Sequence, residues 1–197
     1  MLLHAEQYLE VKAPIPTSGT LTSSGKVIEV LDKGKGCVVT VGMTTKDEHG
    51  NAILYNEFSN FVRGTKGVGE SKRNERGLAT AQYTMPTRVP DATIREQTVT
   101  SQAALYRLSG DINPLHIDPQ MSAMGGFDVP ILHGLCTFGI AGKHIVQAFA
   151  KGDGACLKNI KVSWESYQRG YTFAQSQPRL ALQSMSTLVR LSKQKCG

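Results

Sequence analysis

The feature that most constrains the fold is one apolar stripe in the second half of the chain. Its members recur at spacings of 4, 3, 4, 3 and 4, which is the period of a single helix face, and they are Ile131, Leu135, Phe138, Gly142, Ile145 and Phe149. Pro130 is favourable at a helix start, and Lys151-Gly152 is typical of a helix end. The pattern predicts one helix of about 20 residues with a continuous face to bury.

Three glycines within this stretch indicate close packing. Gly134, Gly139 and Gly142 each cost a helix up to about 1 kcal/mol. The sequence therefore predicts that other backbone approaches closely there, as when a sheet wraps around a buried helix. Gly134 also falls in the first turn, where backbone N–H groups lack an intrahelical partner and can stabilise an oxyanion.

Three β-rich runs precede this helix. They are residues 25–32 (GKVIEVLD), 36–45 (GCVVTVGMTT) and 51–63 (NAILYNEFSNFVR). The connections between them contain the Gly and Asp or Asn residues that are typical of hairpins. The sequence thus predicts an antiparallel meander beside a buried helix.

Composition is that of a globular protein and does not favour a nucleic-acid partner. The 197 residues are 40% hydrophobic, which is enough for one sizeable core, and no apolar run reaches the length of a membrane span, which is about 20 residues. The net charge is +6, but residues 162–197 hold five basic side chains and one acidic side chain among many Ser and Gln. A solvated, weakly folded tail explains this charge better than a basic binding face. Glu6 and Glu10 argue against a signal peptide.

The cysteines do not predict a disulfide framework or a zinc site. They lie far apart without a C-x-x-C pair, at Cys37, Cys136, Cys156 and Cys196, so free thiols are expected. His133 and Cys136 lie three residues apart on the predicted helix, but two ligands without a third make a weak metal site. We therefore expect core packing for this pair and no metal.

Residues 64–77 (GTKGVGESKRNERG) combine four glycines with four basic side chains. The segment lacks the Lys-Ser/Thr pair of a phosphate-binding P-loop and the third glycine of a dinucleotide turn. A mobile, solvated surface loop is the favoured interpretation. The alternative is that the cations hold a phosphorylated substrate tail; they are Lys66, Lys72, Arg73 and Arg76.

The stretch GDINPLHIDP, residues 110–119, places a carboxylate, a carboxamide and an imidazole within six positions. An amphipathic helix is expected at 98–108, and Ser109-Gly110 would end it. Asn113-Pro114 predicts a new helix start. Asp111 then lies in the entry loop and His116 on the first turn, so that both can converge on one water molecule. The alternative is that the acidic and amide side chains are helix caps and that the histidine only packs.

These residues carry a resemblance to a known family. YRLSGDINPLHIDP, followed by GFDVPILHGLCTFG, resembles the signature of the hydratase 2 family, the MaoC-like R-specific 2-enoyl-CoA hydratases, and especially the hydratase unit of peroxisomal multifunctional enzymes of type 2. The matching positions are Tyr106, Gly110, Asp111, Asn113, Pro114, His116, Pro130, His133 and Gly134. HAEQYLE and CLKNIKV also resemble family segments, so the resemblance covers about residues 4–162.

The resemblance implies an α+β hot dog fold, in which an antiparallel sheet wraps around one long helix and two such units are fused. On this basis we expect an incomplete double hot dog. Residues 1–63 would be a remnant of the first unit, 64–97 a loop and linker, and 98–162 the second unit with the catalytic motif. Residues 163–197 do not align with family strands and would form an atypical tail.

The resemblance also implies the chemistry. Asp111 and His116 would activate the water that adds across the double bond, and Asn113 would orient them. The N–H of Gly134 would polarise the thioester carbonyl. Which member of the pair is acid and which is base stays open from sequence, and no cofactor is implied. The partners expected are an acyl-CoA thioester and a second copy in a homodimer, with no nucleic acid and no membrane span.

Two other functions stay open. One is another hot dog activity on acyl-CoA, such as a thioesterase, and the other is a catalytically silent fragment that binds acyl-CoA or a partner. For the hydratase itself, an incomplete scaffold is expected to impair activity. The resemblance suggests the peroxisome, but the terminal KCG is not an S-K-L type address, so the cytoplasm is the alternative.

Overall fold

The computed structural model describes residues 2–81, 91–164 and 185–191. These residues fall into two compact units. The first contains residues 2–81, 145–163 and 186–191, and the second is built mainly from residues 91–144. Within the described residues, no helix is both long and apolar enough to cross a membrane.

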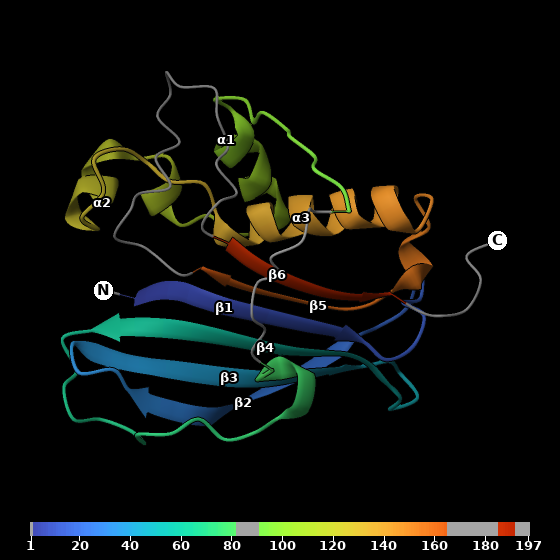
Figure 1. Cartoon of the computed structure of the whole chain (residues 1–197), viewed down its shortest axis with the longest axis horizontal. Coiled ribbons are helices and arrows are strands. Elements are labelled where there is room, and N and C mark those ends of the chain that lie inside the picture. Colours follow the sequence, from blue (N-terminus) through green and yellow to red (C-terminus); the bar gives the residue numbers. More distant parts are fainter. Residues whose placement is uncertain (1, 82–90, 165–184, 192–197) are drawn as a thin grey trace. The chain divides into compact units, whose positions relative to one another are not determined.

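The first unit is one sheet with the strand order β2-β3-β4-β1-β5-β6 (Figure 1). The strands are β1 (Leu2–Val11), β2 (Thr22–Asp32), β3 (Gly36–Lys46), β4 (Ala52–Arg63), β5 (Leu157–Trp164) and β6 (Met185–Leu191). The predicted meander is confirmed, because β2 pairs with β3 and β3 with β4, both antiparallel. Strand β6 lies within the segment expected to be an atypical tail, and the rest of that segment beyond residue 164 lies outside the described residues.

The N-terminal strand holds the sheet together. β1 pairs antiparallel with β4 on one side and with β5, from the far end of the sequence, on the other. The side chains of Leu31, Ile160 and Val162 are almost fully buried. β-Bulges interrupt β1 just before Glu6 and β2 just before Glu29, and bulges re-aim the side chains that follow them.

Residues 64–81, called the strap below, cross the edge of this sheet. Glu70 accepts a hydrogen bond from the N–H of Asp32 (3.0 Å) and donates one to the carbonyl of Val30 (2.8 Å). Gly69 has φ +104, and a Cβ there would lie 2.5 Å from the Val30 carbonyl oxygen, so the position requires glycine. A 3-10 turn, η1 (Gly77–Ala79), follows. The expected exposure to solvent is confirmed, because most of residues 64–77 are exposed, but backbone bonds at Glu70 fix the segment to β2.

The second unit is made of short helices and the start of a longer one. They are α1 (Gln102–Tyr106), the 3-10 turns η2 (Arg107–Ser109) and η3 (Pro114–His116), α2 (Pro119–Met124) and α3 (Gly134–Phe149), whose last residues belong to the first unit. A further 3-10 turn, η4 (Gly154–Cys156), leads into β5. The helix predicted at 98–108 exists over fewer residues, and its apolar Leu105 and Leu108 are exposed.

The long helix α3 differs from its prediction in two ways. It begins at Gly134, four positions after Pro130, so its length is 16 residues. Its buried side chains are Cys136, Thr137 and His144, whereas Leu135 and Phe149 of the predicted stripe are exposed. A Cβ at Gly139 would meet no atom of the described residues within 4 Å. Close approach of the described backbone therefore does not explain this glycine.

Candidate active site

Local hydrogen bonds shape the corner formed by residues 110–116. Gly110 adopts the left-handed conformation (φ 107) that ends η2, as predicted. The N–H of Asn113 donates to Oδ1 of Asp111 (3.2 Å), and Oδ1 of Asn113 accepts from the N–H of Leu115 (3.1 Å). The capping roles weighed as an alternative are therefore real. They do not exclude chemistry, because an ionised carboxylate has further acceptor capacity on its second oxygen.

His116 is held in one tautomer. Its Nδ1 lies 2.7 Å from the carbonyl oxygen of Ile131. A carbonyl can only accept, so Nδ1 carries the proton and Nε2 of the neutral ring is an acceptor. Burial lowers the pKa of His116 below its usual value of 6.5, although the Ile131 carbonyl and Asp111 act in the opposite direction. The imidazole is therefore neutral near pH 7 and able to accept a proton.

His133, expected to be a packing residue, lies in the same cluster. It is 1% exposed and its ring stacks on that of His116, with centroids 3.7 Å apart and an interplanar angle of 30°. The ring of Tyr106 lies beside that of His133, with centroids 4.8 Å apart. Nε2 of His133 lies 3.2 Å from the carbonyl oxygen of Asp111, so Nε2 carries the proton. Burial and the neighbouring His116 lower the pKa of His133. The only sequence signal for this residue was its place in the family signature.

Functional atoms of Asp111, His116 and His133 lie within 4.8 Å of one another. A carboxylate and two imidazoles could suggest a metal ion. The stacking argues against one ion shared by both rings, because the lone pairs of near-parallel imidazoles run side by side and do not converge. Cys136, the other candidate ligand, is not in the cluster; its Sγ lies 3.7 Å from Nε2 of Gln102.

Gly134 is the first residue of α3. The carbonyl of His133, just before it, accepts from the N–H groups of Cys136 (3.1 Å) and Thr137 (3.4 Å), which fixes the backbone at the helix start. The first N–H groups of a helix have no intrahelical acceptor. The structure thus places Gly134 directly after a cluster residue, and its oxyanion role stays a prediction.

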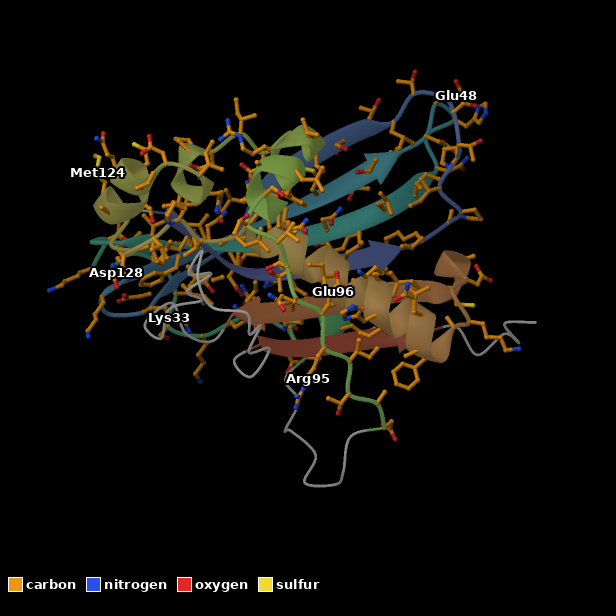
Figure 2. The ribbon with its side chains drawn as sticks, turned by 90° about the horizontal axis from the view of Figure 1, so that it is seen from above. Lys33, Glu48, Arg95, Glu96, Met124 and Asp128 are labelled. Atoms are coloured by element: carbon orange, nitrogen blue, oxygen red, sulfur yellow. The ribbon has the colours of Figure 1, made fainter. Side chains whose placement is uncertain are left out.

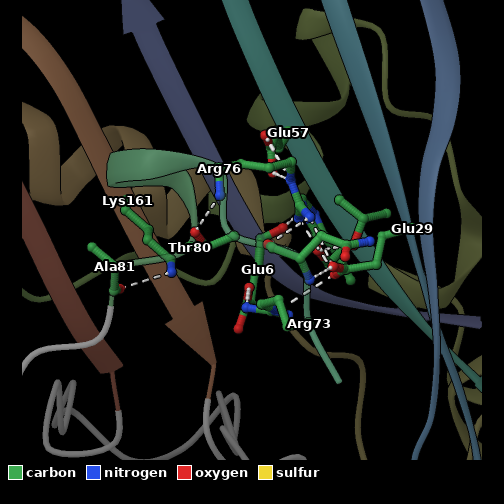
Figure 3. Close-up of polar contacts among 12 residues, drawn as sticks. Glu6, Glu29, Glu57, Arg73, Arg76, Thr80, Ala81 and Lys161 are labelled. Atoms are coloured by element: carbon green, nitrogen blue, oxygen red, sulfur yellow. Dashed lines mark hydrogen bonds and ion pairs between the residues drawn. The ribbon is translucent and has the colours of Figure 1, made fainter. Parts of the chain in front are cut away.

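Two of the four predicted phosphate-binding cations are already paired (Figure 3). Arg73 binds Glu6 (2.9 Å) and Glu29 (3.4 Å). Arg76 binds Glu29 (2.7 Å) and Glu57 (3.0 Å). These arginines hold the strap on the sheet, a function that the charge of the loop did not reveal. Lys66 and Lys72 are exposed.

In this ion-pair network, the partners of Glu29 determine the direction in which its pKa is shifted. Burial would raise the pKa of Glu29, but the hydrogen bonds of Arg76 and of the Asn74 N–H, with the charges of both arginines, hold it below its usual value. The C-terminal end of the strap is also fixed. Lys161 on β5 is buried and donates to the carbonyl of Ala81 (3.2 Å), and burial lowers the pKa of its ammonium group.

Another polar group, on α3, is separate from the cluster. Glu96 lies beside α3 (Figure 2). Its Oε2 lies 2.6 Å from both Nζ of Lys143 and Nε2 of His144.

Among the cysteines, Cys37 and Cys136 are free and buried, whereas Cys156 is disulfide-bonded. The expectation of free thiols is therefore wrong for Cys156.

The fold and the Asp111–His116 corner together define a MaoC-like protein of hot dog architecture. Residues 80–167 match the model of the MaoC like domain, and residues 1–64 match the MFE-2 hydratase 2 N-terminal domain. The chain belongs to the MaoC-like hydratase 2 family, as its motifs indicated.

Individual relatives agree with this assignment. The peroxisomal hydratase-dehydrogenase-epimerase of Neurospora crassa is 54% identical over 165 residues, covering 82% of this chain and 18% of the relative. The solved full-length peroxisomal multifunctional enzyme type 2 of Drosophila melanogaster has a TM-score of 0.75 at 44% identity, covering 83% of this chain and 29% of that one. The chain thus spans less than a third of either protein.

A third comparison concerns the fold alone. A Mycobacterium tuberculosis protein with a double hot dog fold is 14% identical to this chain and has a TM-score of 0.53, covering 83% of this chain and 58% of that protein. The predicted hot dog class is confirmed.

Proposed function

We propose that this chain hydrates trans-2-enoyl-CoA to (3R)-3-hydroxyacyl-CoA, a step of fatty-acid β-oxidation. The observation that carries the proposal is the 2.7 Å bond between Nδ1 of His116 and the Ile131 carbonyl. This bond leaves Nε2 as a proton acceptor within the cluster that also contains the Asp111 carboxylate. A base and an anion around one water are what conjugate addition of water requires.

The tautomer of His116 supports one division of the roles that sequence left open. Nε2 of His116 removes a proton from water while the carboxylate of Asp111 orients that water. The oxygen bonds to the β carbon, and the π electrons move to the thioester, where the N–H of Gly134 stabilises the enolate oxygen. The imidazolium then returns its proton to the α carbon. The negative charge of Asp111 favours the transient imidazolium, since it acts to raise the pKa of His116.

Substrate binding, assembly and location follow as further parts of the proposal. Arg73 and Arg76 are paired with carboxylates, so the phosphates of coenzyme A would meet Lys66 and Lys72 instead. A homodimer and a peroxisomal location are proposed from the family; the similar protein of Neurospora crassa is named as peroxisomal.

The test follows loss of the enoyl-thioester absorbance together with thiol release. Hydration removes the chromophore without releasing thiol, whereas a thioesterase releases thiol. Asp111→Asn and His116→Gln should each abolish most of the activity. Matched controls are Glu48→Gln, at the β3–β4 connection (Figure 2), and His49→Gln, because both side chains are exposed. Thiol release, or wild-type rates in both site variants, would overturn the proposal.

A further inference from the structure

We propose that His133 is a positioning residue that fixes Asp111 for catalysis through the hydrogen bond from its Nε2–H to the Asp111 carbonyl. The inference rests on the proposed function and extends it to a third side chain. His133 would not touch the substrate. It would act on the reaction by holding the backbone that carries the carboxylate.

The burial of His133 is poorly explained by packing alone. The residue is 1% exposed, and its Nδ1 is buried without a hydrogen-bond partner among the described residues. A buried, unpartnered polar atom is unfavourable, and an apolar side chain at this position would avoid it. What an apolar side chain could not supply is the donor at Nε2, which reaches the Asp111 carbonyl at 3.2 Å.

This bond completes the fixation of Asp111. On one side, the carboxylate accepts from the N–H of Asn113 at 3.2 Å. On the other side, the carbonyl accepts from His133. Asp111 itself is exposed and follows a glycine in the left-handed conformation, so local chain stiffness alone does not hold it. The two bonds together set the direction of the second carboxylate oxygen.

The ring of His133 also connects the two catalytic groups. It stacks on His116 at 3.7 Å while its Nε2 binds Asp111. One buried side chain thus sets the separation between the base and the anion that share a water. Misplacement of a catalytic group by about 1 Å can cost about 100-fold in rate.

Three variants separate the donor from the ring. His133→Gln keeps an N–H near the position of Nε2 and loses the ring, His133→Phe keeps a ring and loses the donor, and His133→Met loses both while filling volume. We expect kcat to fall about 10- to 100-fold in the Phe and Met variants with little change in KM, and to fall much less in the Gln variant. Thermal melts identify the folded variants.

The outcomes distinguish a positioning role of His133 in catalysis from a purely structural role. A Phe variant with wild-type kcat, or a Gln variant as impaired as the Phe variant, would overturn the proposal, because the donor would then not matter. If both variants without a donor fail to fold while the Gln variant folds, His133 is required by the fold, and the catalytic role is likewise overturned.

A second measurement keeps this inference separate from the proposed function. If the wild-type chain shows no hydration, the proposed function fails, yet the Asp111 corner can still be examined. Amide hydrogen exchange at Asn113, whose N–H binds the Asp111 carboxylate, should lose protection in His133→Phe and keep it in His133→Gln. Equal protection in both variants would refute the fixation of Asp111 by His133.

Discussion

Two clusters of ionisable residues in this chain are built on opposite principles. In the strap network of the first unit, cations meet carboxylates directly, as Arg76 does with Glu29 and Glu57. In the Asp111 corner of the second unit, backbone groups hold the side chains: the Ile131 carbonyl holds His116 and the Asn113 N–H holds Asp111. Opposite-charge pairing satisfies the charged atoms and stabilises a fold. Backbone bonds fix orientation and leave Nε2 and the second carboxylate oxygen available for chemistry.

The largest expected effect tests the corner. Asp111→Asn should lower kcat about 10²- to 10⁴-fold, the range over which acid–base groups contribute, while the melting temperature stays near that of the wild type. Asp111 is exposed, and asparagine can still accept the bond from the Asn113 N–H. Steady-state kinetics and a thermal melt measure the two quantities. A large loss of stability with unchanged kcat would mean that Asp111 stabilises the fold, as the ion pairs of the strap do, and does not serve catalysis.

The strap should show the opposite response. Arg76→Met leaves the fully buried Glu29 carboxylate short of its principal partner, and removing one member of a buried ion pair costs about 3–5 kcal/mol. Urea unfolding should show this loss of unfolding free energy, with kcat of the remaining folded protein unchanged. Lys33→Met is the matched control, since Lys33 is exposed at the β2–β3 connection (Figure 2). Stability equal to that of the control would mean that the pairs do not hold the strap.

A smaller effect tests whether the close contact of Gly69 with β2 also holds the strap in place. Gly69→Ala combines a φ of +104 with a Cβ 2.5 Å from the Val30 carbonyl oxygen, and should cost about 1–3 kcal/mol of unfolding free energy. Gly67→Ala is a matched control in the same segment, with φ +68 and no atom of the described residues within 4 Å of its Cβ. The difference between the two variants isolates the contact with β2. If Gly67→Ala lowers the unfolding free energy as much as Gly69→Ala does, the strain of a positive φ, and not the contact with β2, explains why glycine stands at both positions.

The sequence predicted local structure well where local chemistry decides it. The hairpins of β2, β3 and β4, the left-handed Gly110 and the Asn113 cap all follow from residue types within a few positions. Long-range pairing was not predictable. The strap cations meet Glu29 and Glu57, more than 15 positions away in sequence, and no local pattern marks such partners.

The long helix and His133 show the same limit. Periodicity in α3 indicated a buried stripe, but which face is buried depends on neighbours that sequence spacing does not reveal, and Leu135 and Phe149 are exposed. His133 lies 17 positions from His116, and the stack between them depends on how the corner meets the chain before α3. The candidate residues of a short motif were therefore predictable from sequence, whereas the stacking of His133 on His116 was not.

The smallest expected effects are changes with pH. They distinguish the strap network, where the unfolding free energy should change, from the corner, where activity should change. For the strap, the pKa of Glu29 is lowered by its partners, so its contribution to stability is present above the unfolded value of about 4.5 and is lost as the pH falls through the folded value. Unfolding free energy measured between pH 7 and pH 3 should therefore fall in acid, and Arg76→Met should weaken that dependence. An unchanged slope in this variant would show that other carboxylates govern acid stability.

For the corner, the pH dependence should appear in activity and at higher pH. The pKa of His116 is lowered from 6.5 by burial, and its neutral form is the base, so kcat/KM should be constant near pH 7 and fall in acid with a midpoint below about 6.5. His49→Gln, which removes an exposed histidine, should leave this midpoint unchanged. A midpoint above 6.5 would mean that Asp111 outweighs burial at His116, so that the corner, like the strap, is governed by pairing of opposite charges.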